Sequence, residues 1–141
     1  MDKDDLHRRY IVETLTAKDN DKVADSAIIL WQQIATNISS IVGESGFHSL
    51  YIRSIFLGSS KFPWLASYNP KSEIGNQFAE LKICFEKQPT AHIKEANKHL
   101  LITLTDILAS LVGEPITTYI LCMAWGDVAP DIVTKEFQNE E

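Results

Sequence analysis

The sequence predicts an all-α protein, a six-helix bundle that occupies a single domain over residues 1–141. Apolar residues recur at spacings of three and four along most of the chain, which is typical of helices with one buried face. No stretch sustains the alternation of apolar and polar residues that marks a strand, and no Asn-Gly or Asp-Gly pair marks a hairpin turn. The hydrophobic share of 45% and the charged share of 23% are ordinary for a globular domain.

A short segment occurs twice in the chain. Residues 40–44 read Ser-Ile-Val-Gly-Glu, and residues 110–114, at an offset of 70, read Ser-Leu-Val-Gly-Glu. In both copies the glycine interrupts an apolar helical stripe, and the glutamate precedes a stretch almost free of charge. Two interpretations are open. The halves 1–69 and 70–126 are three-helix copies related by a pseudo-two-fold axis, or two helix corners merely look alike.

Three helices are predicted in the first half, over residues 2–18, 21–42 and 46–59. Aspartates at the start of the first range suit the positive end of a helix dipole. The second range has the clearest amphipathic pattern in the chain. Its apolar stripe consists of Ala27, Trp31, Ile34, Ile38 and Ile41. Gly43 follows where a helix commonly ends in a left-handed residue, and Ser45 can cap the next helix.

An aromatic connector, residues 62–68, separates the halves. Pro63 forbids a continuing helix there, so large apolar rings are presented outside regular helix. A fourth helix is expected after Pro70, with its apolar face formed by Ile74, Phe78, Leu81 and Phe85. Pro89 ends this helix, because a helix usually stops before a proline.

Two more helices complete the second half. The fifth covers residues 90–112 and ends at Gly113. The sixth covers residues 115–125 and ends at Gly126. An acidic tail, residues 127–141, follows.

Charged residues are scarce in the two halves' later helices. Between Glu44 and Lys61 the sequence has one charged residue, Arg53, and between His99 and Gly113 it has one, Asp106. A lone buried arginine needs a carboxylate, since an unpaired buried charge costs several kcal/mol. We therefore expect Arg53 to pair with Asp106 and fix helix packing. The alternative is an anion-binding site on Arg53, with Tyr51 and Asp106 as further candidate ligand-binding residues.

The connector supplies a second candidate site, formed by Phe62, Trp64 and Leu65. Aromatic side chains often anchor interfaces, and monomers seldom expose large apolar patches. These residues are thus expected to bind a protein partner or a second copy of the chain as a homodimer. The competing interpretation is that the connector folds back and plugs the end of the helical core.

The sequence contains no motif for catalysis, metal binding or a cofactor. His92 and His99 are two helical turns apart, too far to share a metal, and neither is followed by the x-x-Lys-Gly of histidine phosphotransfer domains. Cys84 and Cys122 lie among apolar neighbours without metal-ligand spacing. We expect no enzyme activity, no metal and no cofactor.

Charge and hydropathy limit the partners further. A net charge of −6 gives no general support for nucleic-acid binding. The longest charge-free runs, 45–52 and 115–126, are shorter than the ~20 apolar residues that span a membrane. The first residues lack the apolar core of a secretion signal, which predicts a cytoplasmic location.

Three segments carry a resemblance: residues 43–47 (Gly-Glu-Ser-Gly-Phe), 50–54 (Leu-Tyr-Ile-Arg-Ser) and 62–65 (Phe-Pro-Trp-Leu). They resemble small uncharacterised bacterial proteins found around signal-transduction systems. The resemblance covers residues 30–65 and, more weakly, 104–125, and it implies no known activity.

These observations lead to one expected function with two alternatives. The expected function is a non-catalytic cytoplasmic interaction or regulatory module in bacterial signalling. The first alternative is a small-molecule sensor with a pocket near Arg53. The second is an atypical histidine phosphotransfer protein.

Overall fold

The computed structural model describes residues 3–17, 22–67 and 77–126. All regular elements in these segments are helical, so the predicted all-α class is confirmed. The elements are α1 (Lys3–Thr16), α2 (Val23–Lys61), the 3-10 helix η1 (Pro63–Ser67), α3 (Gln77–Glu86), α4 (Thr90–Val112) and α5 (Glu114–Trp125). Among these helices, none combines the length and apolarity needed to cross a membrane. Ile74 and the acidic tail lie outside the described residues.

The described part of the chain has five α-helices where the sequence predicted six. The helices predicted over residues 21–42 and 46–59 form one element, α2, with a single non-helical residue inside it. That residue is Gly43, whose φ of 86° and ψ of 163° belong to a region open almost solely to glycine. We call residues 23–42 the first limb of α2 and residues 44–61 its second limb.

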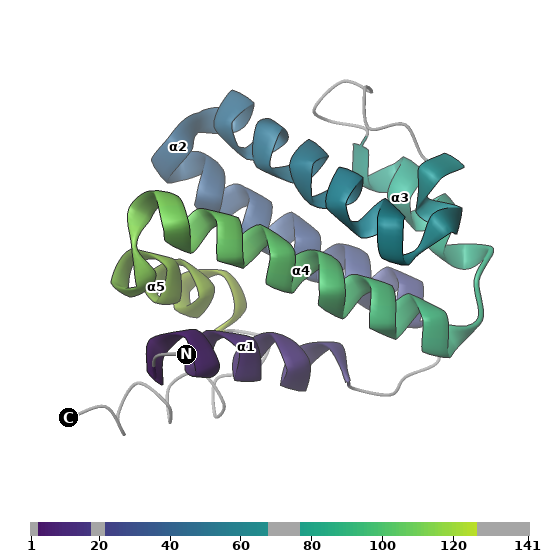
Figure 1. Ribbon diagram of the computed structural model, residues 1–141, viewed down its shortest axis with the longest axis horizontal. Helices are drawn as coiled ribbons and strands as arrows, with labels where there is room; N and C mark the ends of the chain where they lie inside the picture. Colours follow the sequence, from purple (N-terminus) through teal and green to yellow (C-terminus); the bar gives the residue numbers. More distant parts are fainter. Residues whose placement is uncertain (1–2, 18–21, 68–76, 127–141) are drawn as a thin grey trace.

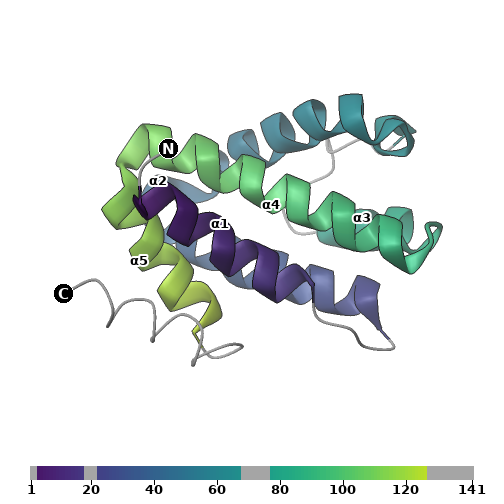
Figure 2. The same ribbon diagram turned by 60° about the horizontal axis from the view of Figure 1, so that its bottom comes forward.

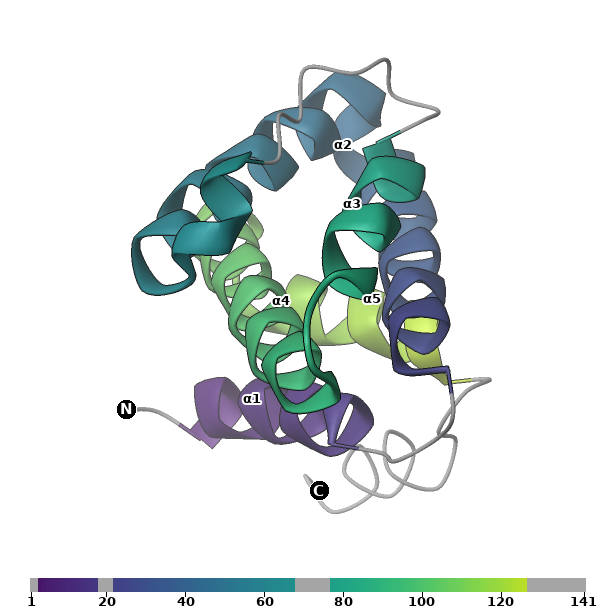
Figure 3. The ribbon, with the colours of Figure 1, turned by 90° about the vertical axis from the view of Figure 1, so that its right-hand side faces the viewer.

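Gly113 forms a matching corner between α4 and α5. Its φ of 93° and ψ of 157° nearly equal those of Gly43. Both predicted helix stops are therefore correct, and both corners lie at the left end of the molecule in Figure 1. The second limb of α2 runs back along the long axis, whereas α5 runs across the bundle, as the end-on view of Figure 3 shows.

The helices pack around the pair formed by α2 and α4. Helix α5 contacts both members of this pair, whereas α3 contacts α2, and α1 contacts α4 and α5. In the end-on view of Figure 3, α1 and α3 lie on opposite sides of α4. The core is mainly apolar, with Ile34, Leu100, Leu104 and Trp125 fully buried. Burying each such side chain stabilises the fold by roughly 1.5–3 kcal/mol.

Four aromatic rings join both limbs of α2 to α3. Tyr51 is fully buried, and its ring centroid lies 5.2 Å from Trp31, 6.0 Å from Phe47 and 5.5 Å from Phe78. Edge-to-face pairs of this kind contribute about 0.5–1.5 kcal/mol beyond their burial. Tyr51 is thus a core residue that holds the corner at Gly43 closed.

Figure 2 shows the start of α1 beside the other corner, between α4 and α5. A buried arginine attaches α1 to this corner. The side chain of Arg8 is 2% exposed, and its Nε and Nη2 donate to the two carboxylate oxygens of Glu114 at 3.1 and 2.9 Å. Nη1 donates to Asp106 Oδ1 at 2.5 Å and to Thr105 Oγ1 at 3.0 Å. Burial alone lowers the pKa of Arg8, but the hydrogen bonds to Glu114 and Asp106 outweigh it and raise this pKa above its ordinary value. The guanidinium therefore stays charged.

Replacing Arg8 with leucine is expected to destabilise the protein strongly. The substitution leaves Glu114 and Asp106 without their buried partner, which typically costs ~3–5 kcal/mol. Urea denaturation measures this loss. The matched control is Lys98→Ala, which removes the exposed Lys98–Glu95 pair at 3.4 Å and should cost less than ~1 kcal/mol. Equal losses in the two variants would contradict a central role for Arg8.

Candidate functional site

The expected pair between Arg53 and Asp106 does not form. Asp106 instead binds two arginines of α1, Arg8 at 2.5 Å and Arg9 at 3.1 Å. Arg53 is exposed on the second limb of α2, with its guanidinium carbon 6.0 Å from the ring centroid of Phe56. The prediction was wrong because α1 brings its arginines to α4, whereas Arg53 lies on the outer surface. Arg53 therefore needs no buried carboxylate.

The aromatic connector folds back onto the bundle. Leu65 is fully buried, whereas Phe62 and Trp64 are partly buried. The Phe62 ring lies 5.6 Å from the ring of His99 in α4, and the Trp64 ring lies 6.1 Å from that of Phe85 in α3. These contacts fit the interpretation of the connector as a plug. The Leu65 side chain is not available to a partner, so these residues do not form one open docking surface.

The histidines and cysteines of the described residues are not gathered into a reactive centre. In that part of the chain, no group of three or more His, Cys, Asp or Glu side chains is placed to hold a metal ion. His92 is exposed in the first turn of α4, and His99 is half-buried against the connector. Cys84 and Cys122 are free and half-buried, and burial raises the pKa of the Cys84 thiol. A protonated thiol of this kind is a poor nucleophile.

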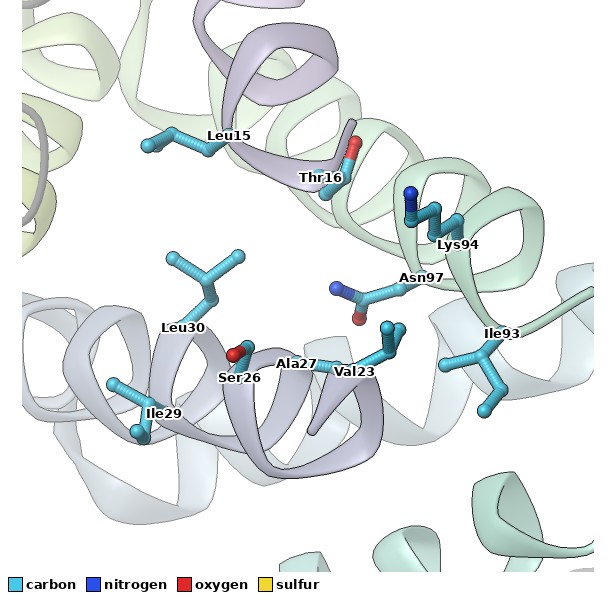
Figure 4. Close-up of a pocket in the computed structure, with 10 residues that line it drawn as sticks. All are labelled: Leu15, Thr16, Val23, Ser26, Ala27, Ile29, Leu30, Ile93, Lys94 and Asn97. Carbon is cyan, nitrogen blue, oxygen red and sulfur yellow. The ribbon is translucent and has the colours of Figure 1, made fainter. Parts of the chain in front are cut away.

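A cavity of about 150 Å³ opens where the end of α1, the start of α2 and the first turns of α4 meet (Figure 4). Its walls are mainly apolar side chains with four polar or charged residues, which come from α1, α2 and α4. The lining residues are Leu15, Thr16, Val23, Ser26, Ala27, Ile29, Leu30, Ile93, Lys94 and Asn97. Small-molecule sites usually combine apolar walls with a few placed polar groups in this way.

Asn97 supplies an oriented hydrogen-bond donor to this cavity. Its side chain is 3% exposed, and its Oδ1 accepts a hydrogen bond from Trp31 Nε1 at 2.7 Å. An indole N–H can only donate, so the amide must present its oxygen to Trp31. Nδ2 consequently points the other way, into the cavity, as Figure 4 shows. It makes no hydrogen bond to the described residues.

The remaining polar groups lie near the open side of the cavity. Lys94 Nζ donates to the carbonyl oxygen of Ala17 at 3.4 Å and so links α4 to the end of α1. The Thr16 hydroxyl donates to the Val12 carbonyl at 2.8 Å. Lys94 is the charged member of the lining set. The described lining is therefore mainly apolar, with Thr16, Ser26, Lys94 and Asn97 as its polar members.

Sequence reasoning missed Asn97, although the sequence carries a signal for it. Asn97 lies four residues after Ile93 and four before Leu101, on the apolar stripe of α4. A polar residue at a core position must find a hydrogen-bond partner, and it often marks a specific site. Charged and histidine side chains are the stronger signals of a site in a sequence, and a single amide on an apolar helix face is a weaker one.

Comparison of the chain with protein-family profiles, characterised proteins and solved structures finds no match.

Protonation of His99 is expected to weaken the fold at acidic pH. Burial, together with the charge of Lys61, lowers the pKa of His99 below its ordinary value near 6.5. The unfolded chain then binds the proton at a higher pH than the folded chain. The contribution of neutral His99 to the free energy of unfolding is therefore fully present above the pKa of the unfolded chain. It is lost as the pH falls through the lower pKa of the folded chain. Urea midpoints of the wild type and His99→Gln between about pH 7.5 and 5 test this, and identical pH slopes would refute it.

Proposed function

We propose that this chain is a non-catalytic helical module that binds a small apolar molecule in the cavity between α1, α2 and α4. The observation that carries the proposal is the amide of Asn97, which is buried, fixed by Trp31 and directed into the cavity. A ligand that offers an acceptor to this amide forms a hydrogen bond inside a mainly apolar cavity and so gains affinity. The site differs from the sensor pocket near Arg53 expected from the sequence.

Filling the cavity would also act on the fold. The cavity has a volume of about 150 Å³ and opens to the surface between α1, α2 and α4. A ligand that fills it stabilises the protein by mass action. The end of α1 lines the cavity, and its start is held by the Arg8 ion cluster. A ligand bound in the cavity would therefore add contacts to the end of α1. This arrangement suits a regulatory module, in which a ligand changes how firmly one helix is held.

A cavity-filling substitution tests this function. Ala27 is 4% exposed and lines the cavity, so Ala27→Leu should occupy the space that a ligand needs. We expect the melting temperature of the wild type to rise with toluene or indole, because a ligand that binds the folded state stabilises it. The variant should not respond. The matched control is Ala35→Leu, at a half-buried alanine of the same limb outside the cavity. A wild type that is indifferent to such probes would contradict the proposal.

We also infer that the two halves of the chain are copies of one helical unit. The nearly identical dihedral angles at Gly43 and Gly113 support this. Residues that are 70 positions apart are also buried alike, both before and after the two glycine corners. The buried pairs include Ile11 and Leu81, Leu15 and Phe85, Ile34 and Leu104, Ile38 and Leu108, Leu50 and Ile120, and Tyr51 and Leu121. Ile41 and Leu111, which differ between the two corner segments, are both exposed. The pseudo-two-fold axis then runs along the bundle, and α1 corresponds to α3.

This relation gives the cavity a counterpart in the other half. Leu15 and Ile29 line the cavity, and 70 residues further on their counterparts are Phe85 and His99. Those two residues are the ones on which the aromatic rings of the connector pack. The counterpart hollow is thus filled by rings from the chain itself. By this relation, the cavity at Leu15 and Ile29 suits a ring supplied by a ligand.

Association with a protein partner is a second candidate function, favoured by the outer face of α5. Ile116, Tyr119 and Met123 share this face and are 46%, 56% and 55% exposed. No charged residue occurs from Pro115 to Gly126. Apolar faces of this kind often mark contacts with another chain. We propose this face in place of Phe62, Trp64 and Leu65. Phosphotransfer is the weaker alternative, because His92 lies in the first turn of α4 and lacks the phosphotransfer motif.

Disrupting the outer face of α5 should reduce self-association. Analytical ultracentrifugation of the wild type and a Tyr119→Ser, Met123→Ser double variant measures the effect. We expect a shift toward the monomer in the variant, because apolar area is removed from the contact. The control is Ile83→Ser, which changes an isoleucine of α3 that is 55% exposed. A wild type that is monomeric at all concentrations would exclude self-association through this face.

A further inference from the structure

We infer that the cavity selects small ring compounds that bear a carbonyl group, and that Trp31 sets this selectivity through the amide of Asn97. The inference deepens the proposed function and rests on it. Two features of the described residues carry it. The amide presents its donor to the cavity, and the indole that fixes the amide is itself held by packing.

The hydrogen bond between Trp31 and Asn97 determines which end of the amide faces the cavity. The indole Nε1 donates to Asn97 Oδ1 over 2.7 Å, and an indole N–H cannot accept a hydrogen bond. If the amide turned by half a revolution, its NH₂ would face this N–H, and two donors would oppose each other. Figure 4 shows Nδ2 on the cavity side. The amide therefore offers hydrogen to a ligand.

Packing holds the indole of Trp31 in place. Its side chain is fully buried, and its ring centroid lies 5.2 Å from that of Tyr51 and 6.1 Å from that of Phe78. Protein interiors are close-packed, so the indole cannot swing away from Asn97 without displacing these rings. The donor that faces the cavity is thus fixed before a ligand arrives. Such preorganisation lowers the entropy that is lost on binding.

A fixed donor favours a ligand whose polar group only accepts. A carbonyl oxygen brings no donor of its own, so Asn97 Nδ2 is sufficient to pair it, whereas a hydroxyl group brings an O–H that needs a further acceptor. An ionised group gives up far more hydration free energy than a neutral one when it enters a mainly apolar cavity. The volume of about 150 Å³ suits a single ring, since an apolar cavity of that size accepts benzene.

Two probes of nearly the same shape test the role of the amide on the full chain. Cyclohexanone and methylenecyclohexane differ only in a C=O against a C=CH₂ group. Asn97→Leu replaces the amide by an apolar group of similar size. We expect it to weaken cyclohexanone about threefold to tenfold relative to methylenecyclohexane, because one net hydrogen bond is lost. NMR titration measures both dissociation constants. In the wild type, cyclohexanone should also shift the Asn97 side-chain amide protons downfield, and methylenecyclohexane should not.

A second variant tests the role of Trp31. Trp31→Phe keeps an aromatic ring but removes the N–H, so the amide becomes free to turn its oxygen toward the cavity. Indole and indene differ in an N–H against a CH₂ group and fill the same space, including any space that the smaller ring leaves. We expect indole to gain about threefold to tenfold over indene in this variant, compared with the wild type. An unchanged ratio would show that Trp31 does not set the selectivity.

The outcomes separate this inference from the proposed function. If cyclohexanone and methylenecyclohexane keep the same ratio of affinities in the wild type and in Asn97→Leu, the carbonyl inference is overturned, while their binding still supports the proposed function. If no probe binds the wild type, the proposed function fails as well. Should Asn97→Leu not fold, because it leaves the indole N–H without an acceptor, the double variant Trp31→Phe, Asn97→Leu takes its place. Removing both partners of a hydrogen bond costs less than removing one.

Discussion

The buried guanidinium of Arg8 is the interaction on which the arrangement of the bundle depends. It joins α1 to the corner between α4 and α5 through both oxygens of Glu114 and one of Asp106. The other end of α1 is held differently: Lys94 donates to the Ala17 carbonyl there, and Leu15 and Thr16 form a wall of the cavity. One end of α1 is thus fixed by a buried ion cluster, and the other end borders a mainly apolar hollow.

The helix ends and the fold class could be predicted from the sequence because they depend on local physics. A positive φ near 90° is accessible to glycine and costly for other residues, so Gly43 and Gly113 identify the corners without knowledge of the tertiary structure. Apolar periodicity identified most of the buried faces, as the full burial of Ile34 and Ile38 illustrates, but Ile41 at the end of the predicted stripe is 48% exposed. The count of helices differed because α2 continues in helical conformation on both sides of Gly43.

The candidate sites were less accessible to sequence reasoning, since they depend on which distant segments meet. Arg53 and Asp106 were paired because each is isolated in its own segment, yet the carboxylate binds arginines from a helix about a hundred residues earlier. Leu65 was expected at a surface but is fully buried, because the chain turns back at Pro63. The role of Asn97 depends on the indole of Trp31, and no spacing in the sequence reveals that contact.

Trp31 takes part in two regions that are otherwise described separately. Its nitrogen holds the amide that faces the cavity, and its ring lies edge-on to Tyr51 at 5.2 Å and near Phe78 at 6.1 Å. One rigid, fused-ring side chain therefore connects the cavity to the junction of both limbs of α2 with α3. Because an indole is rigid, the position of the Asn97 amide and the packing of the Tyr51 and Phe78 rings are fixed by the same side chain.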